Sequence, residues 1–142
     1  MKAALLSLLL VCSACAAESI TVRSNDVQVV AATLVLEAGG EGKAGMEAVR
    51  EVIANRSRSS VLTEAEVCLK RLQFSCWNGS TVKAGIEKAK LHKNWSLALE
   101  IANAETTNHT SGATHYHTTK VSPSWAKRLT RTTVIKNHIF YK

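Results

Sequence analysis

Aspartate and proline are almost missing from the sequence, and no long hydrophobic run follows its first residues. Asp26 is the only aspartate and Pro123 the only proline in 142 residues. No proline-rich linker, internal repeat or low-complexity segment therefore divides the chain. Because Asp26 precedes the first helix that the pattern predicts, a mechanism that needs a single carboxylic acid as general acid and base suits this chain. The length suits one domain with a hydrophobic core, and we expect this domain to comprise residues 18–142.

The longest apolar run lies at the N-terminus and is too short to span a membrane comfortably. Lys2, the apolar residues 3–11 and the Ala14–Ala16 cleavage pattern follow one another as in an export signal. We therefore expect residues 1–17 to be a signal peptide that directs the protein to the periplasm, cell wall or extracellular space. The alternatives are a buried N-terminal helix, a retained anchor and a lipoprotein linked through Cys15.

Two cysteines, Cys68 and Cys76, remain after the expected signal. An even pair in an exported chain indicates a disulfide, which we predict here. Its short loop would stabilise the fold by about 2.5 kcal/mol. Two buried free thiols are the alternative, and the spacing is not typical of zinc ligands.

The charge is strongly positive, with a formal net charge of +7 and a pI of about 9.5. Much of the excess lies in the second half of the chain, at Lys83, Lys88, Lys90, Lys93, Lys127, Arg128, Arg131, Lys136 and Lys142. A basic exported protein concentrates near anionic polymers, and outside the cytoplasm these are not nucleic acids. A solvated cationic face without a partner is the alternative.

Apolar residues recur at helical spacing in the first two thirds of the chain and at strand-like spacing near its end. A helix capped by Asn25 or Asp26 is expected from Val27 to the glycines that begin at Gly39. Later helices are expected near residues 44–55, after the Thr63–Glu66 capping box, and at 82–90 and 95–104. The segments 113–119 and 133–141 are each expected to form one strand, and the two to pair antiparallel. This order predicts an α+β fold in a single small domain, with N-terminal helices followed by a small C-terminal antiparallel sheet.

The string LVLEAGGEG places Glu37 at the end of an apolar helix. Neighbours such as Leu34 and Leu36 would desolvate its carboxyl, and desolvation raises the pKa of a carboxyl group. A protonated glutamate can donate to a leaving oxygen, as glycosidases require, and the glycines leave room for a bulky polymer. Glu41 is the only second carboxyl nearby. The plain alternative is an ordinary glutamate at a helix end.

Two other motifs suggest different chemistry. GGEGKAG resembles a phosphate-binding loop, but Glu37 stands where the first glycine is needed and no Ser or Thr follows the lysine. His115 and His117 would share one face of a strand and could bind zinc with His109 or His138, whereas Tyr116 would face the other way. A histidine pair that only lines a groove is the alternative.

The string RLQFSCWNGS combines polar and aromatic residues that could line a sugar-binding groove. Gln73 and Ser75 could form hydrogen bonds with hydroxyl groups, and Trp77 could stack on a sugar ring. A buried aromatic pair beside a surface glutamine is an equally simple interpretation.

Four strings occur together in order: LEAGGEG…AVREVIANR, VC…QFSCWN, GATHYH…SPSW and NHIFYK. With them the chain, from about Ala31 to Lys142, resembles the spore-cortex-lytic cell-wall hydrolase family of the SleB/CwlJ type. The resemblance implies a lysozyme-like domain that acts on the glycan strands of peptidoglycan with one essential glutamate, at Glu37. It also implies that Gln73, Ser75, His115 and Tyr116 border the groove.

The chain departs from the family pattern at three positions. Leu36 stands where the family usually has tyrosine, Gly39 where it has arginine, and Asn108 where an acid often precedes the G-A-T string. These departures concern contacts with the substrate near the acid rather than the acid itself.

We therefore predict a monomeric lytic transglycosylase that cleaves between N-acetylmuramic acid and N-acetylglucosamine and needs no cofactor or metal. Glu37 would be the general acid and base, and Glu41, Gln73, Ser75, Trp77, His115, Tyr116 and His117 would contact the substrate. Its partners would be peptidoglycan and other anionic cell-wall polymers. The alternatives are a muramidase in which Glu41 holds a water, a zinc amidase or peptidase using His115 and His117, and a non-catalytic wall-binding module.

Overall fold

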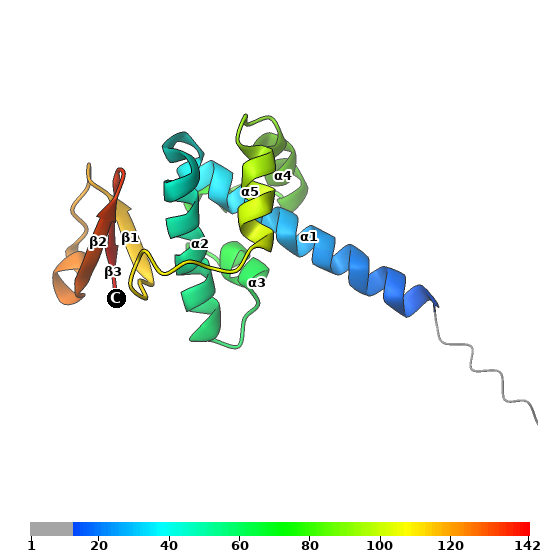
Figure 1. Cartoon of the computed structure of the whole chain (residues 1–142), viewed down its shortest axis with the longest axis horizontal. Coiled ribbons are helices and arrows are strands. Elements are labelled where there is room, and N and C mark those ends of the chain that lie inside the picture. Colours follow the sequence, from blue (N-terminus) through cyan, green and yellow to red (C-terminus); the bar gives the residue numbers. More distant parts are fainter. Residues whose placement is uncertain (1–12) are drawn as a thin grey trace, which may run out of the picture.

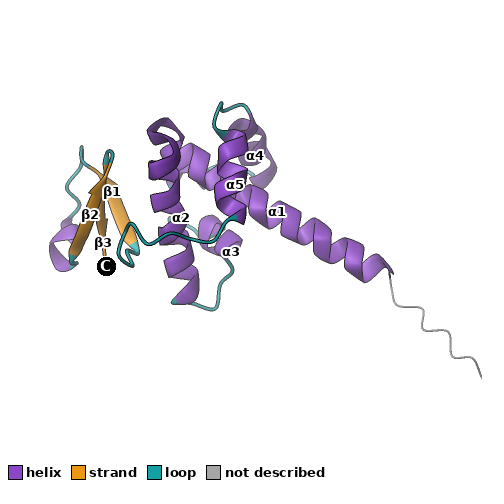
Figure 2. Ribbon diagram, in the orientation of Figure 1, coloured by secondary structure: helices purple, strands orange, loops and turns teal. Residues whose placement is uncertain are grey.

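The computed structural model describes residues 13–142, so most of the expected signal peptide lies outside the described residues. The expected domain boundary at residue 17 falls within the first described helix, α1 (Ser13–Ala38). The helices gather around α1. The strands lie together at one end of the molecule, and the N-terminal half of α1 lies at the other end (Figures 1 and 2). In the described part of the chain, no helix has the length and apolar character needed to cross a membrane.

The C-terminal half of α1 is the centre of the helical core. Val29, Ala31, Ala32 and Leu34 are almost completely buried, and α1 packs against all four other helices. The expected N-terminal cap at Asn25 or Asp26 is not formed, because α1 runs through both residues. A polar residue inside a helix costs only tenths of a kcal/mol, and neither Gly nor Pro interrupts this stretch. The predicted end of the helix before Gly39 is confirmed.

A short turn, η1 (Gly39–Glu41), leads into α2 (Gly42–Arg58), which runs beside α1. Gly42 has a φ of +69°, a conformation that glycine adopts without steric cost. The predicted capping box is confirmed at α3 (Glu64–Leu69), where Thr63 and Glu66 exchange hydrogen bonds. The turn η2 (Ser75–Trp77) and the helices α4 (Val82–Lys90) and α5 (Trp95–Asn103) complete the helical part.

The sheet has three antiparallel strands in the order β1-β3-β2: β1 (His115–Thr118), β2 (Arg131–Ile135) and β3 (His138–Tyr141). The single strand expected over residues 133–141 is therefore wrong. A turn at Lys136, which has a φ of +52°, folds that segment into the β2–β3 hairpin. The preceding loop contains the turn η3 (Ser124–Arg128). The α+β order, with helices first and a small antiparallel sheet last, is confirmed.

Helix α2 joins the helical part to the sheet. On its sheet-facing side, Ala48 and Val52 pack against Phe140 of β3. Glu51, which is 2% exposed, accepts hydrogen bonds from Thr107, from the backbone amides of His109 and Thr110 and from the Thr110 hydroxyl. These bonds fix the connection between α5 and β1 against α2.

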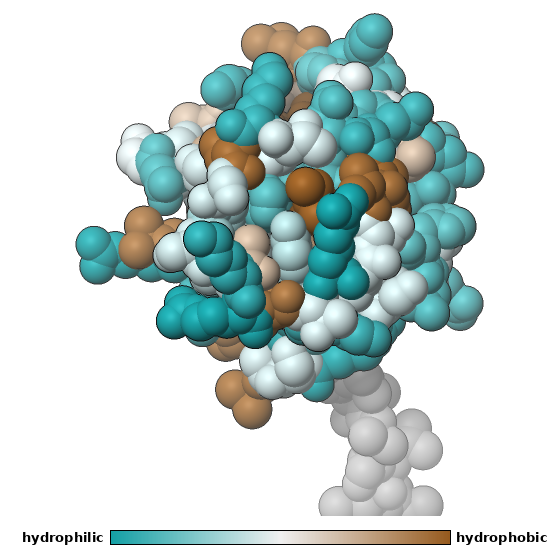
Figure 3. Space-filling model, turned by 90° about the vertical axis from the view of Figure 1, so that its left-hand side faces the viewer, coloured by the Kyte–Doolittle hydropathy of each residue, from teal (hydrophilic) through white to brown (hydrophobic). Residues whose placement is uncertain are grey.

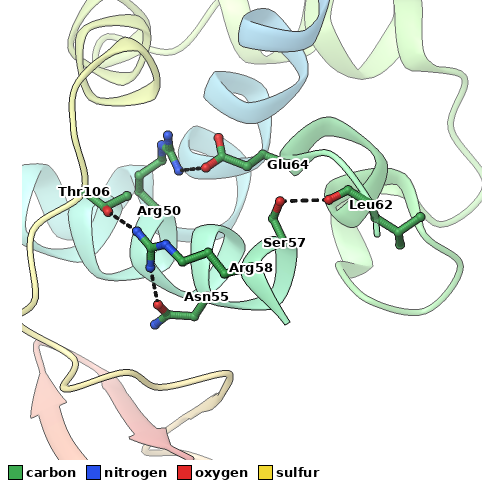
Figure 4. A network of polar contacts seen from close by, with 7 residues as sticks. All are labelled: Arg50, Asn55, Ser57, Arg58, Leu62, Glu64 and Thr106. Carbon is green, nitrogen blue, oxygen red and sulfur yellow. Dashed lines mark hydrogen bonds and ion pairs between the residues drawn. The ribbon is translucent and has the colours of Figure 1, made fainter. Parts of the chain in front are cut away.

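Three further side chains of α2 bind other segments (Figure 4). Arg50 pairs with Glu64 of α3 at 2.6 Å, and Ser57 donates to the carbonyl oxygen of Leu62 at 2.8 Å. Arg58 donates to Thr106 at 2.8 Å. The helix is thereby held to the segments on both sides of it, which determines where the sheet lies relative to α1.

Candidate active site

Glu37 lies in the last turn of α1, where the glycine-rich turn begins. Leu34 and Val35 before it are buried, and the Glu37 side chain itself is half-buried. Its surroundings therefore combine an apolar wall with partial access to solvent. The position of Glu37 at the end of an apolar helix is the one that the sequence predicted.

Two donors from distant parts of the chain hold the Glu37 carboxylate. The backbone amide of Cys76, in η2, donates to Oε1 at 3.3 Å. The Tyr116 hydroxyl, on β1, donates to Oε2 at 3.0 Å. Each oxygen of the carboxylate thus has its own donor, so its plane is fixed relative to both the helices and the sheet.

Tyr116 is held in this position by two rings of β3. Its ring meets His138 edge-on, with centroids 4.9 Å apart, and lies 5.7 Å from Phe140. Burial raises the pKa of Tyr116 well above its usual value, and the neighbouring Glu37 carboxylate raises it further. The phenol therefore stays protonated and remains a hydrogen-bond donor to Glu37.

Glu41 forms a buried pair with His138. Its Oε2 lies 2.9 Å from His138 Nδ1, and the two side chains are only 11% and 5% exposed. The pair connects the start of α2 to β3, immediately beside Tyr116. Glu41 is close to Glu37 in the sequence, but in the structure its carboxylate is bound to His138.

Arg56 is a member of this cluster that the sequence-based list of candidate residues omitted. Its Nε donates to the carbonyl oxygen of Thr114 at 2.6 Å, and its guanidinium lies 5.2 Å from the centroid of the Phe74 ring. Burial lowers its pKa, and the nearby Tyr116, Cys68 and Glu37 oppose this effect. The side chain brings a positive charge to the buried side of the site. The string AVREVIANR contains this arginine, but its spacing gives no sign of where the side chain points.

Gln73 and Ser75 lie just before Cys76, whose amide donates to Glu37, and both are exposed. Trp77 is half-buried and is directed to the helical core. Its Nε1 donates to Thr33 at 3.0 Å, and a Cβ at Gly85 would lie 2.4 Å from its ring. Gln73 and Ser75 are therefore free to meet a ligand, whereas the Trp77 indole is engaged by α1 and α4.

His115 and His117 lie on the face of β1 opposite to Tyr116, as their alternation predicts. His117 stacks on Tyr141 with centroids 5.3 Å apart, and its Nε2 lies 2.9 Å from the Tyr141 hydroxyl. Both histidine rings also face Trp125, at 5.4 and 5.6 Å. The two histidines belong to an aromatic group that is separate from the Glu37 carboxylate.

The histidines proposed as a third zinc ligand make other contacts. His138 is bound to Glu41, and the amide of His109 is bound to Glu51. Within the described residues, no three side chains of His, Cys, Asp or Glu are grouped as a metal site would require.

The predicted disulfide between Cys68 and Cys76 is not formed, and both residues are free cysteines. Burial raises the pKa of Cys68 to about 12, and a hydrogen bond with Thr33 partly opposes this shift. Burial also raises the pKa of Cys76, and the charge of Glu37 raises it further. The thiol of Cys68 lies in the core beside Thr33, and the thiol of Cys76 lies beside Glu37. The number of cysteines in the sequence does not specify these surroundings.

Gly39, where the family pattern has arginine, is packed too closely for a side chain. A Cβ at this position would lie 2.9 Å from the His92 ring. The carbonyl oxygen of Gly39 also accepts a hydrogen bond from Asn94 Nδ2 at 2.8 Å. The segment between α4 and α5 thus fills the space beside the turn that follows Glu37.

A separate pocket lies between α2 and the end of α5. Its lining includes Arg50, Leu97, Ile101 and Thr107 and the acids Glu100 and Glu105. Glu37 and Tyr116 do not line this pocket. It is therefore distinct from the carboxylate site.

Comparison with known proteins gives a family match and two structural matches. A family model described as cell wall hydrolase matches residues 40–141, beginning just after Glu37. The catalytic domain of the Bacillus cereus SleB protein is 25% identical, with a TM-score of 0.60, and the match covers 84% of this chain and 91% of that chain. The catalytic domain of the germination-specific lytic transglycosylase SleB from Bacillus anthracis is 24% identical, with a TM-score of 0.64 and coverage of 83% and 94%. No curated protein matches the chain.

Proposed function

This chain belongs to the cell wall hydrolase family, of the SleB/CwlJ type, and from that membership we propose that it cleaves the glycan strands of peptidoglycan. The bond cut is the one between N-acetylmuramic acid and N-acetylglucosamine, and Glu37 is the general acid and base. The observation that carries this proposal is the Glu37 carboxylate, half-buried and held by Cys76 and Tyr116 from two other parts of the fold.

The first step transfers a proton from Glu37 to the glycosidic oxygen, and the bond from this oxygen to C1 of the muramic acid breaks. Glu37 is then a carboxylate, and hydrogen bonds from the Tyr116 hydroxyl and the Cys76 amide stabilise its charge. The sugar C1 carries developing positive charge, which the carboxylate beside it stabilises.

The second step returns the proton to Glu37. The 6-hydroxyl of the same muramic acid attacks C1, its proton passes to the Glu37 carboxylate, and a 1,6-anhydro ring closes. The proton cycle is complete without water and without a second carboxylate. A single half-buried glutamate is sufficient for both steps, which supports the proposal of a lytic transglycosylase.

The position of Glu41 favours this route over hydrolysis. A hydrolytic enzyme of the inverting type needs a second carboxylate that is free to activate a water molecule. Glu41 is instead bound to His138, with a side chain that is 11% exposed. A carboxylate engaged in this way is poorly placed to serve as that base.

We further propose that Gln73 and Ser75 contact sugar hydroxyls, because both are exposed and lie just before Cys76, whose amide holds Glu37. His115 and His117 line the other side of β1 and would contact the polymer only where it passes around the sheet. Because the substrate lies outside the cytoplasm, we also propose that the protein is exported, as the predicted signal peptide indicates.

Digestion of purified sacculi by the protein and by Glu37→Gln tests the proposal. Mass spectrometry of the products should show 1,6-anhydromuramic ends with the unsubstituted protein. The rate for Glu37→Gln should be lower by about 10²–10⁴-fold, the usual value of general acid–base catalysis. The control is Glu87→Gln, which removes an exposed glutamate of α4 and should leave the rate unchanged.

Other products would identify the alternatives. Reducing muramic ends would show that the enzyme is a muramidase, and free stem peptides lost on chelation would indicate a zinc amidase. Binding without any released fragment would indicate a wall-binding module. Full activity of Glu37→Gln would refute the proposed role of this residue.

A further inference from the structure

The positive charge of the molecule is concentrated in its last quarter. The first 105 residues contain twelve Lys or Arg and eleven Asp or Glu, so their charges nearly cancel. The 37 residues from Thr106 to Lys142 contain six Lys or Arg and no Asp or Glu. Almost the whole net charge of +7 therefore resides in the segment that forms the sheet and its connections.

All six cationic side chains of this segment are exposed. We define the basic sheet surface as these six residues: Lys120, Lys127, Arg128, Arg131, Lys136 and Lys142. The side of the molecule at which the sheet lies is covered largely by hydrophilic side chains, among which hydrophobic ones are scattered (Figure 3). No apolar patch dominates that view, so the surface is better suited to a charged partner than to an apolar one.

The register of the sheet places these cations at both of its ends. Arg131 lies opposite Tyr141, and Lys142 exchanges backbone hydrogen bonds with Thr130, so Arg131 and Lys142 are at one end. Lys136 lies in the β2–β3 turn at the other end, where the amide of Thr119, next to Lys120, donates to Asn137. The charge thus lies at both ends of the sheet, and Lys127 and Arg128 add to it from η3.

The acids nearest to the sheet do not neutralise this surface. Glu37, Glu41 and Glu51 point inward and are bound to Tyr116, to His138 and to the connection that follows α5. Among residues 25–142, none of the ion pairs involves a cation of the basic sheet surface. At physiological salt a charge acts over about 8 Å, so neighbouring cations of this surface add their attraction for one polyanion.

The same sheet supplies Tyr116 to Glu37. Trp125 of η3 packs on His115 and His117, on the face of β1 opposite to Tyr116, so a polymer bound at η3 reaches Glu37 by passing around the sheet. In peptidoglycan the peptide branches, which carry free carboxylates, are attached to muramic acid, the sugar that Glu37 would act on. We propose that the basic sheet surface binds the carboxylates of these peptide branches and thereby holds the glycan strand across Glu37. The proposal rests on the proposed function for the identity of the polymer.

Binding of inactive protein to purified walls tests this surface. The first variant combines Glu37→Gln with Lys127→Glu, Arg128→Glu and Arg131→Glu. The matched control combines Glu37→Gln with Lys83→Glu, Lys88→Glu and Lys93→Glu, three exposed lysines on or just after α4. Both triple changes lower the net charge equally. The walls are peptide-bearing sacculi from which phosphate polymers have been removed.

In 50 mM salt the sheet variant should bind about tenfold more weakly than Glu37→Gln alone, because exposed charge pairs contribute tenths of a kcal/mol each. The α4 control should differ by less than about twofold, and the difference between the variants should nearly vanish in 1 M salt. Glycan strands stripped of peptides by an amidase should bind both variants equally. If the sheet variant does not fold, the milder changes Lys127→Gln, Arg128→Gln and Arg131→Gln in the Glu37→Gln protein supply the comparison, against Lys83→Gln, Lys88→Gln and Lys93→Gln.

Several outcomes would overturn the proposal. Equal weakening by the two triple changes would show that total charge matters and the sheet does not. Unchanged binding of the sheet variant would show that the surface has no part in binding. Equal loss on stripped glycan, or binding that requires phosphate polymers, would exclude the peptide branches. None of these results bears on bond cleavage, which the product analysis of Glu37→Gln tests separately.

Discussion

At the scale of single residues, the geometry of Glu37 depends on donors that lie far away in the chain. Tyr116 is 79 residues from Glu37, and Cys76 is 39 residues away. One donor is a side chain and the other a backbone amide, so only Tyr116 can be removed by substitution. This difference allows the contribution of the phenol to be measured by itself.

Tyr116→Phe should lower kcat with little change in KM. The substitution keeps the ring that packs against His138 and Phe140 but removes the hydroxyl that binds Glu37. A hydrogen bond to a charged group contributes about 1.5–3 kcal/mol, which corresponds to about 10–100-fold in kcat. The rate of muropeptide release measures the effect. An unchanged kcat would show that the phenol does not help Glu37 to act.

The interaction between Glu41 and His138 should stabilise the fold, so removing one partner should cost more than half of what removing both costs. Removing one partner leaves an unpaired buried group, so His138→Ala or Glu41→Gln alone should each cost about 3 kcal/mol of unfolding free energy. The double variant should cost clearly less than the sum of the two. Urea unfolding of all three proteins measures this, and additive losses would mean that the two side chains do not interact.

At the scale of secondary-structure elements, α2 connects the helical core to the sheet. It packs against Phe140 on one side, pairs through Arg50 with α3, and binds the connection between α5 and β1 through Glu51. The sheet therefore takes its position from α2, and Tyr116 takes its position from the sheet. A change at Glu51 should weaken this chain of contacts without touching Glu37.

Glu51 should make stability depend on pH. Burial alone would raise the pKa of Glu51, but hydrogen bonds from Thr107, Thr110 and His109 outweigh it and lower the pKa. Because the folded pKa is the lower one, this stabilisation is complete above the unfolded value of about 4.3 and is lost as the pH falls through the folded value.

Glu51→Gln should therefore cost about 2 kcal/mol at pH 7 and less near pH 3, since the protonated glutamate has already lost these bonds. Denaturant unfolding at the two pH values measures the difference. Glu105→Gln, which changes an exposed glutamate, should have little effect at either pH. An equal cost for Glu51→Gln at both pH values would contradict the role assigned to its charge.

At the scale of the whole molecule, the free thiols mean that the fold is held by packing and hydrogen bonds. Cys68 and Cys76 are both free, so a reductant should leave the melting temperature unchanged. The measurement is thermal unfolding of the purified protein with and without dithiothreitol. A melting temperature that falls by several degrees in reductant would show that a disulfide forms after all.

The uneven distribution of charge is also a property of the whole molecule. The helical part is nearly neutral and the sheet carries most of the excess, so the molecule has a basic end. The family members with known structure that match here share the arrangement of helices and sheet, at 24% and 25% identity. The basic sheet surface is argued from this chain alone, and its contribution is tested by the charge-reversal variants.

Local pattern was sufficient for several features of the fold. The helical spacing, the glycines after Ala38 and the Thr63–Glu66 capping box predicted elements that the structure contains. The same reasoning merged β2 and β3, because a turn at Lys136 and Asn137 has no glycine or proline to mark it. The same reasoning also placed the start of α1 too late, because a residue that can cap a helix does not interrupt one that continues on both sides of it.

The sequence by itself determined that this is a helical domain followed by a small sheet, with an acid at the end of its first long apolar helix, because these properties follow from neighbours a few residues apart. Only the tertiary structure decided that Tyr116 holds Glu37, that His138 binds Glu41 from 97 residues away, and that Cys68 and Cys76 are free thiols. The physical reason is that such contacts form where helices and sheet pack together, and the spacing of residues along the chain does not specify that packing.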